Sequence, residues 1–154
     1  MRIRLVRDAD YPEITRLRRQ TIRTVNSNDY SEDIIQDWTT QANTQTFRNN
    51  AHKHKRWVAI EKNKIIGFCD HNFACELSRV YVHKDHLRKG VGSRMLAVAE
   101  KSLRKLGCKE VRIESTITAK KFYEKNGYKV LKKTFYKTKN MRSTVYKMSK
   151  RFIG

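Results

Sequence analysis

Apolar and polar side chains alternate in several stretches of this chain, and this period of two predicts strands. Near the N-terminus, Ile3 and Leu5 alternate with arginines, as in a half-exposed strand. Similar patterns, rich in β-branched and aromatic residues, predict strands over residues 56–60, 65–73, 75–82, 110–115, 128–136 and 141–152. Asn63 and Lys64 lie between two of these ranges and predict a hairpin turn.

Other stretches repeat their apolar residues every three to four positions, which predicts amphipathic helices. Ile14, Leu17 and Ile22 give residues 11–25 one apolar face, and Pro12 is tolerated in the first turn. Comparable patterns predict helices over residues 31–38, 91–106 and 115–123. The polar residues 39–55 predict a loop or a loose helix. Strands and helices mixed in this order predict a single α/β domain over residues 1–154.

The segment Glu76–Arg94 joins a predicted strand to a predicted helix through a basic turn. Gly90 and Gly92 let the backbone approach a ligand, and the first N–H groups of the helix attract anions. Arg88 and Lys89 add positive charge at the same place. The segment therefore predicts a bound anionic group, in particular a phosphate. A plain connection without a ligand is the alternative interpretation.

The positive charge of the chain is large and unevenly distributed. The 154 residues carry a formal net charge of +20. Residues 1–77 hold 13 basic and 10 acidic side chains, whereas residues 78–154 hold 22 and 5. Such asymmetry favours contact with a polyanion, whether nucleic acid, a ribosome or an anionic cofactor, although a solvated basic surface would give the same numbers.

Three further features restrict the class of protein. Cys69, Cys75 and Cys108 lack the spacing of a zinc site, so we expect reduced thiols in a cytoplasmic protein. The histidines show no clustering with carboxylates or thiolates, and we expect no metal. No apolar run approaches the ~20 residues of a membrane helix, and we expect no membrane contact.

Two motifs in this order of elements resemble the GNAT N-acetyltransferase family. Residues 87–92, Leu-Arg-Lys-Gly-Val-Gly, resemble the Gln/Arg-x-x-Gly-x-Gly/Ala motif that follows the fourth strand of the family. Residues 119–128, Ala-Lys-Lys-Phe-Tyr-Glu-Lys-Asn-Gly-Tyr, resemble its Ala-x-x-Phe-Tyr-x-x-x-Gly-Phe element. Leu87 replaces the usual Gln or Arg, and Thr116 stands where many members have an Asn that contacts pantetheine.

The resemblance implies a mixed seven-stranded sheet flanked by about four helices, with the fourth and fifth strands splayed apart. Acetyl-CoA, as co-substrate, would lie in the V-shaped gap between these two strands. Backbone groups of Val80 and Val82 would pair with the pantetheine amides, and residues 88–93 would wrap the pyrophosphate. The implied cofactor-binding residues are Val80, Tyr81, Val82, Arg88, Lys89, Gly90, Val91, Gly92, Ser93, Thr116 and Ala119.

The implied reaction is acetyl transfer to a primary amine by direct attack in a ternary complex. By resemblance, the Tyr123 hydroxyl would protonate the departing CoA thiolate as general acid. Glu76 lies where some members carry their general base, and partial burial would raise its pKa. The loop over residues 30–55 is expected to form the acceptor-side wall, with a small-molecule or protein amine as acceptor. Of the aromatics around it, Trp38, Phe47 and Trp57, core packing is the favoured interpretation and substrate contact the alternative.

One alternative belongs to a different class of function. The basic C-terminal half also suits a non-catalytic module of this fold that binds nucleic acid or ribosomes. Tyr123 and the paired glycines favour the enzyme, because a module without catalysis has no need of them. A positive cleft would disfavour polyamine acceptors if its charge faces the site. The sequence is compatible with a monomer or a homodimer.

Overall fold

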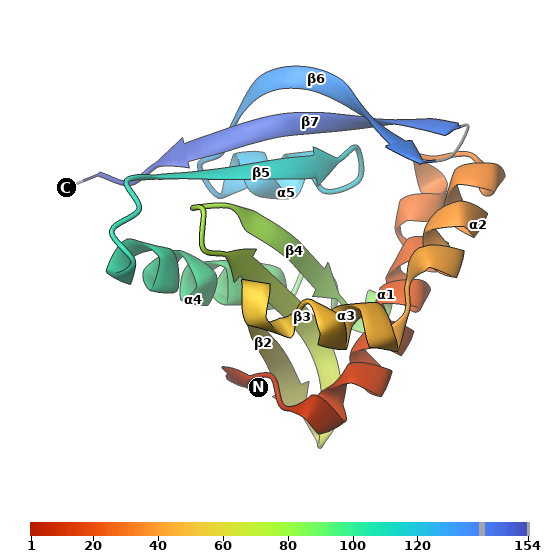
Figure 1. Ribbon diagram of the computed structural model, residues 1–154, viewed down its shortest axis with the longest axis horizontal. Coiled ribbons are helices and arrows are strands. Elements are labelled where there is room, and N and C mark those ends of the chain that lie inside the picture. The colour runs from red at the N-terminus through yellow and green to blue at the C-terminus, as the bar shows by residue number, and fades with distance from the viewer. Residues whose placement is uncertain (139–140, 154) are drawn as a thin grey trace.

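The strands form two hydrogen-bonded sheets in the computed structural model, which describes residues 1–138 and 141–153 (Figure 1). The N-terminal sheet has the order β1-β2-β3-β4, and the C-terminal sheet has the order β5-β7-β6. All neighbours within each sheet are antiparallel. The strands are β1 (Arg2–Leu5), β2 (His54–Glu61), β3 (Lys64–Asn72), β4 (Leu77–Val82), β5 (Glu110–Thr116), β6 (Lys129–Thr138) and β7 (Met141–Arg151).

The two sheets meet at the start of β4 and β5 and diverge from there. An isolated parallel bridge joins Glu76 to Arg112, and the Arg112 N–H donates to the Cys75 carbonyl oxygen at 3.1 Å. Beyond this point, β4 and β5 are not paired in the described part of the chain. The predicted splay is therefore confirmed. The implied seven-stranded sheet is better described as sheets of four and three strands that share one bridge.

The described residues form five α-helices, compared with the four or so that we predicted. Their bounds are α1 (Tyr11–Thr24), α2 (Glu32–Gln41), α3 (Thr44–Asn49), α4 (Val91–Lys105) and α5 (Lys120–Lys125), with short 3-10 helices at Asp8–Asp10, Asn26–Asn28, Ala51–Lys53 and Lys84–His86. The additional helix is α3, within the polar stretch 39–55. Asn43 caps it by accepting a hydrogen bond from the Thr46 N–H at 3.0 Å, and Phe47 anchors it in the core.

Helices cover the N-terminal sheet on both faces. On one face α4 packs against β3 and β4. The hydrophobic core on this face extends under the C-terminal sheet as far as Met148 on β7. On the other face α1 and α3 pack around Phe68. Val80 and Val82 pack against the first core and Tyr81 against the second, as alternation along a strand requires. In the described residues, no helix combines the length and the hydrophobicity needed to cross a bilayer.

The prediction of three reduced thiols is wrong for two of the cysteines. Cys75 and Cys108 form a disulfide, with Cα atoms 5.8 Å apart, directly before β4 and β5. The two residues are separated by 33 positions, and only the convergence of the strand starts brings them together. Cys69 is a free, fully buried thiol, and burial raises its pKa above the ordinary value.

Candidate active site

A continuous cleft of about 1120 Å³ occupies the V between β4 and β5. One end lies at the start of α4 beside α5, and the other end reaches α1, α2 and the strands β6 and β7. Every predicted cofactor-binding residue except Lys89 lines this cleft. Lys89 lines a smaller hollow with Met1 and Glu61 instead. The cleft is large enough to hold an extended ligand together with a second, smaller one.

The wall formed by β4 is an open strand edge. The His83 N–H donates to the Ile66 carbonyl oxygen on β3 at 2.8 Å. Alternate residues of a strand direct their backbone groups to the same side, so Tyr81 also faces β3. Val80 and Val82 therefore direct their N–H and C=O groups into the cleft. An extended ligand could pair with them as an added strand would.

The start of α4 forms the anion-attracting end of the cleft. Gly90 caps the helix with a φ of 80°, a left-handed conformation that favours glycine. The N–H groups of Val91, Gly92 and Ser93 lie in the first turn, where an α-helix has no acceptors of its own for them. Together with the helix dipole, they attract negative charge. The nearby Arg88 side chain also lines the cleft.

The two motifs recognised in the sequence contact each other at this end. A Cβ atom on Gly92 would lie 3.0 Å from Cε1 of Phe122, so any larger residue there would require the ring to shift. The Asn126 side-chain amide also donates to the Ser93 hydroxyl at 3.4 Å. The second motif therefore fixes α5 against the first turn of α4.

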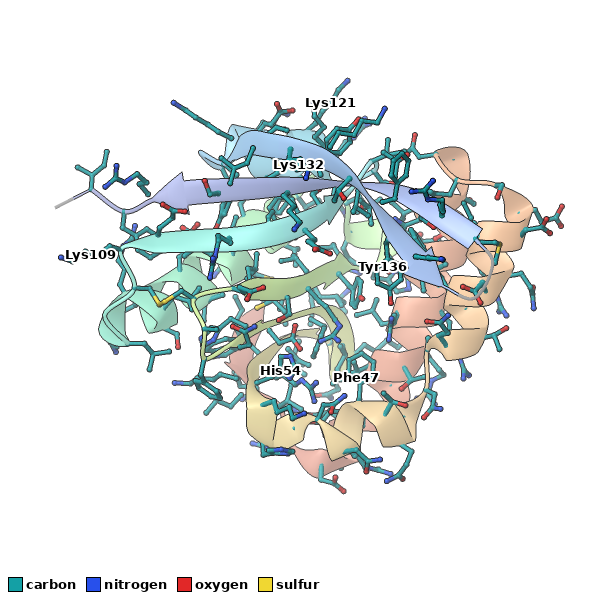
Figure 2. The ribbon with its side chains drawn as sticks, turned by 45° about the horizontal axis from the view of Figure 1, so that its top comes forward. Phe47, His54, Lys109, Lys121, Lys132 and Tyr136 are labelled. Atoms are coloured by element: carbon teal, nitrogen blue, oxygen red, sulfur yellow. A yellow bond between two sulfur atoms is a disulfide. The ribbon has the colours of Figure 1, made fainter. Side chains whose placement is uncertain are left out.

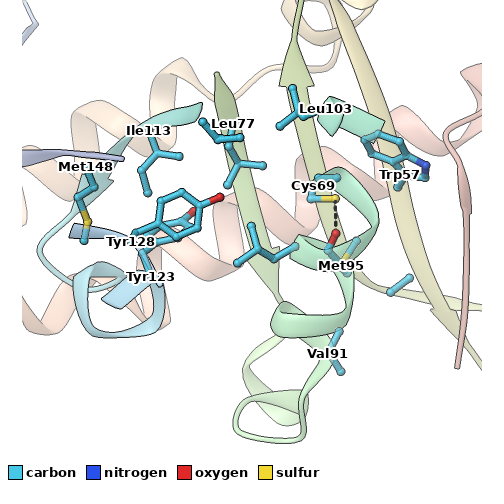
Figure 3. Packing of buried hydrophobic residues seen from close by; sticks show 14 of the residues in the cluster. Trp57, Cys69, Leu77, Val91, Met95, Leu103, Ile113, Tyr123, Tyr128 and Met148 are labelled. Carbon is cyan, nitrogen blue, oxygen red and sulfur yellow. Dashed lines mark hydrogen bonds between the residues drawn. The ribbon is translucent and has the colours of Figure 1, made fainter. Parts of the chain in front are cut away.

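Tyr123 lies in the wall of the cleft close to β4 and is 6% exposed. Its ring contacts Phe122 and Tyr128 edge-on, with centroids 5.1 and 5.6 Å apart, and Figure 3 shows it packed beside Tyr128 in the core. Burial raises the pKa of the Tyr123 phenol above its ordinary value of about 10. The hydroxyl is therefore protonated at neutral pH and has a proton to donate.

Two threonines line the cleft on the side of β5. The Thr116 hydroxyl accepts a hydrogen bond from the Ala119 N–H at 3.2 Å, which holds the turn before α5. This turn is why α5 begins at Lys120, later than predicted. The Thr118 hydroxyl is buried and has no hydrogen-bond partner in the described part of the chain. Thr118 was not predicted as a site residue, because the residues next to it in the sequence do not distinguish it from other turn residues.

The carboxylate that lines the cleft is Glu114, and not Glu76, the general base predicted from the sequence. Glu76 is exposed at the closed end of the V and does not line the cleft. Glu114 on β5 does line it, as the acidic side chain among the described lining residues. Glu114 is itself exposed and lies on the face of β5 opposite to Val111 and Ile113, which point into the core, so alternation along the strand alone did not indicate its place in the cleft. The described residues contain no group of three or more possible metal ligands.

The far end of the cleft is aromatic and basic. Trp38 lines it, together with Tyr81 and Tyr136, whereas Phe47 and Trp57 are buried in the core as expected. Figure 2 shows Tyr136 on β6, on the side of α1. The basic residues of the lining are Arg18 and Arg79 at this end and Arg88, Lys121 and Lys125 toward α4 and α5. Five basic residues thus line the cleft, with Glu114 as the acidic residue among the described lining.

Tyr30 ties the helical wall of this end to the C-terminal sheet. Its hydroxyl donates to the Thr144 carbonyl oxygen at 2.6 Å and accepts from the Ile117 N–H at 2.8 Å. Its ring also packs on Trp38, with centroids 4.6 Å apart. The segment between α1 and α2 is therefore attached across the open side of the V, to the strand and loop opposite.

These features define a class of protein, an α/β acyltransferase fold with splayed central strands, and comparison with known proteins agrees. The family profile described as "Acetyltransferase (GNAT) domain" matches residues 26–150. The chain is 25% identical over 132 residues to an uncharacterized N-acetyltransferase, YafP, of Escherichia coli K12, covering 86% of this chain and 83% of that protein. The chain belongs to the GNAT acetyltransferase family.

Solved structures show the same fold. A GCN5-related N-acetyltransferase from Rhodopseudomonas palustris superposes with a TM-score of 0.93 at 19% identity, over 98% of this chain and 95% of that one. The PaiA N-acetyltransferase of Thermoplasma acidophilum, crystallised in complex with coenzyme A, gives a TM-score of 0.79 at 23% identity, over 99% and 100% of the two chains. At these identities the likeness concerns the fold alone.

Proposed function

We propose that this protein transfers the acetyl group of acetyl-CoA to a primary amine by direct attack in a ternary complex. The observation that carries the proposal is the single cleft in which the open edge of β4 lies between the start of α4 and the aromatic far end. The related PaiA enzyme was crystallised with coenzyme A, which supports the same class of co-substrate here.

In this proposal, acetyl-CoA binds along β4 with its pyrophosphate at the start of α4. Val80 and Val82 pair with the pantetheine arm, and residues 88–93 supply N–H groups and Arg88 to the phosphates. Leu87 lines this part of the cleft and provides an apolar contact where other members have a polar side chain. The unpaired hydroxyl of Thr118 is available to the pantetheine arm beside Thr116.

The chemical step needs no enzyme nucleophile. The neutral amine nitrogen attacks the thioester carbonyl carbon, and an N–H of the β4 edge stabilises the oxyanion that forms. The C–S bond then breaks, and Tyr123 donates its proton to the leaving thiolate. The nitrogen releases its extra proton toward Glu114, which lines the cleft. Glu76 is the residue predicted from the sequence to accept this proton. Its side chain is exposed and lies outside the cleft, and this location does not support the role.

Calorimetric titration with acetyl-CoA, followed by an assay of CoA release with a panel of amines, tests this function. We expect saturable binding and amine-dependent release of CoA. The competing function is a basic module that binds nucleic acid without catalysis. Absence of acetyl-CoA binding at millimolar ligand, together with RNA binding that weakens steeply with salt, would establish that alternative.

A further inference from the structure

The far end of the cleft contains a cluster of arginines arranged around one aromatic ring. The guanidinium carbon atoms of Arg18, Arg56 and Arg79 lie 5.3, 5.2 and 5.3 Å from the centre of the Phe47 ring. Arg18 comes from α1, Arg79 from β4, and both line the cleft, whereas Arg56 is buried behind them. Attraction between cations and the ring face holds the guanidinium groups in place.

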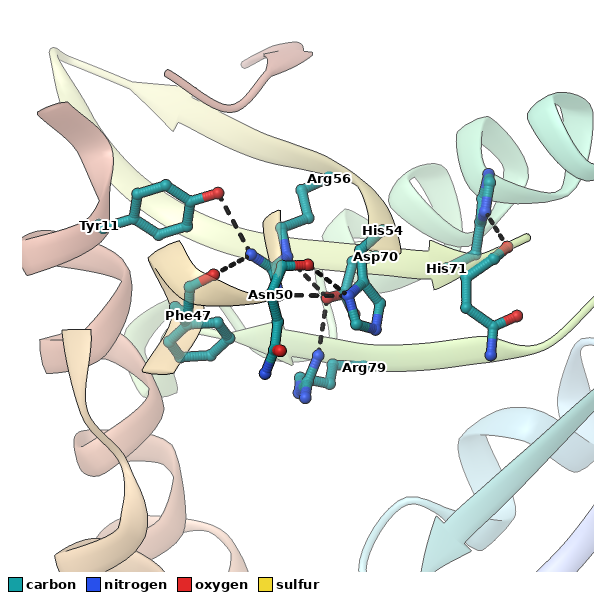
Figure 4. Close-up of polar contacts among 9 residues, drawn as sticks. Tyr11, Phe47, Asn50, His54, Arg56, Asp70, His71 and Arg79 are labelled. Carbon is teal, nitrogen blue, oxygen red and sulfur yellow. Dashed lines mark hydrogen bonds and ion pairs between the residues drawn. The ribbon is translucent and has the colours of Figure 1, made fainter. Parts of the chain in front are cut away.

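A buried aspartate fixes two of these arginines (Figure 4). Asp70 is fully buried, and its Oδ2 accepts hydrogen bonds from Arg56 Nε at 3.0 Å and Arg79 Nη1 at 2.8 Å. Arg56 also donates from Nη1 to the Phe47 carbonyl oxygen at 2.6 Å and to the Tyr11 hydroxyl at 3.2 Å. These contacts occupy most of the donors of Arg56, so it serves to position Asp70 and Phe47.

Arg79 and Arg18 retain donors that no group in the described residues accepts. Arg79 makes its hydrogen bonds and ion pair in the described residues to Asp70 alone, and its side chain is 27% exposed. Arg18 forms no ion pair in the described part of the chain, and its Nε is buried without a hydrogen-bond partner. Asp70 thus pairs with Arg56 and Arg79, whereas Arg18 has no carboxylate partner in the described residues, and the two arginines that line the cleft give it an excess of positive charge.

A partly buried excess charge is costly unless a counterion is present. We infer that the acceptor is a small amino acid, whose carboxylate binds between Arg18 and Arg79 while its amine extends along β4 toward the thioester. This inference rests on the proposed function and names the substrate class of that same site. A guanidinium pair is well suited to a carboxylate, because its planar donors match the two oxygens. The cluster would also repel a polyamine.

Matched pairs of acceptors test the inference directly. The standard amino acids, each beside its C-terminal amide, and spermidine as a cationic comparator are supplied with acetyl-CoA while CoA release is followed. We expect one or more free acids to be acetylated and the matching amide to show a KM roughly 10- to 100-fold higher, since it loses a charge-assisted hydrogen bond. Spermidine should be a poor acceptor.

A pair of variants on α1 assigns the effect to the arginine cluster. Arg18→Gln should raise the KM of the acid roughly tenfold, with kcat changed little and the KM of the amide unchanged. Arg16→Gln removes an exposed arginine of the same helix outside the cleft and should change neither value. Arg18 is the better test than Arg79, because removing Arg79 also leaves Asp70 with one partner fewer.

The possible failures are distinguishable. If acetyl-CoA does not bind, the proposed function itself fails. If acetyl-CoA binds but no free amino acid accelerates CoA release, or spermidine and the amides are preferred, only the inference about the acceptor is overturned. Equal effects of Arg18→Gln on the acid and on its amide would overturn it as well.

Discussion

At the scale of single residues, burial assigns different tasks to neighbouring tyrosines. Tyr123 and Tyr128 are both buried, with ring centroids 5.6 Å apart. The Tyr128 hydroxyl donates to Glu100 at 2.7 Å, and Glu100 also pairs with Lys150 at 3.0 Å, so this group is committed to the core. Tyr123 lines the cleft, and its raised pKa keeps the proton in place. Of these two tyrosines, Tyr123 is the one that lines the cleft and is our proposed general acid.

We expect Tyr123→Phe to lower kcat by roughly 100-fold or more while the Kd of acetyl-CoA changes little, because a general acid acts in the transition state. Tyr128→Phe is the matched control and should lower stability but not kcat. Steady-state kinetics and calorimetry measure both. Since the pKa of Tyr123 is raised, its ionisation should not limit the rate below pH ~10. An unchanged kcat in Tyr123→Phe would refute the role.

The two candidate bases can be separated in the same way. Glu114→Gln should lower kcat, because the variant cannot accept the proton of the amine. Glu76→Gln should leave kcat as it is, since Glu76 lies outside the cleft. The opposite outcome, with kcat lowered only in Glu76→Gln, would restore the prediction made from the sequence.

At the scale of elements, the site depends on how α5 packs on α4. The first turn of α4 lines the cleft, and its position depends on the helix beside it. Gly92 in this turn is buried and admits the Phe122 ring of α5 at close range. The ring and the glycine therefore set the distance between the two helices, and with it the width of this end of the cleft.

Gly92→Ala should weaken acetyl-CoA binding and cost about 1–3 kcal/mol of stability, because the new Cβ would lie 3.0 Å from Phe122 and must displace it. Thermal unfolding and calorimetric titration measure the two effects. Phe122→Leu in the Gly92→Ala background should recover part of both, because the smaller side chain makes room. Absence of any recovery would mean that the Phe122 contact is not the cause.

At the scale of the whole molecule, β4 and β5 are joined at one end of the V-shaped gap between them and are separated at the other end. The disulfide and the Glu76–Arg112 bridge join the starts of β4 and β5. Toward the other end, Tyr30 connects the helical segment to the C-terminal sheet, while the separating strands leave room for the cleft. The geometry of the site is therefore a property of both sheets together.

We expect Cys75→Ser with Cys108→Ser to lower the free energy of unfolding by about 2–4 kcal/mol, because the disulfide closes a long loop in the unfolded chain. Reductant should lower the Tm of the parent protein and leave that of the double variant unchanged. Thiol titration of the denatured, unreduced protein should find Cys69 alone. Three reactive thiols and no response to reductant would contradict the disulfide.

Local patterns in the sequence predicted most of the elements and both motifs. Periodicity records which face of a strand or helix is buried, and so it located β4, the start of α4 and the opposite faces of Val80 and Tyr81. The glycine pair and the Phe-Tyr motif lie on short segments whose backbone chemistry is local. These features carried the resemblance to the family, and that resemblance implied the splayed strands and Tyr123 beside them.

Only the tertiary structure decided which distant residues share a space. The sequence could not show that Cys75 meets Cys108, that Glu114 rather than Glu76 lines the cleft, or that Arg18 and Arg79 gather at Phe47. Such contacts depend on how separate elements pack. The spacing of apolar residues along the chain does not show which distant residue a side chain contacts. The local backbone chemistry thus determined what the start of α4 can bind, and the packing of both sheets determined what can be brought to it.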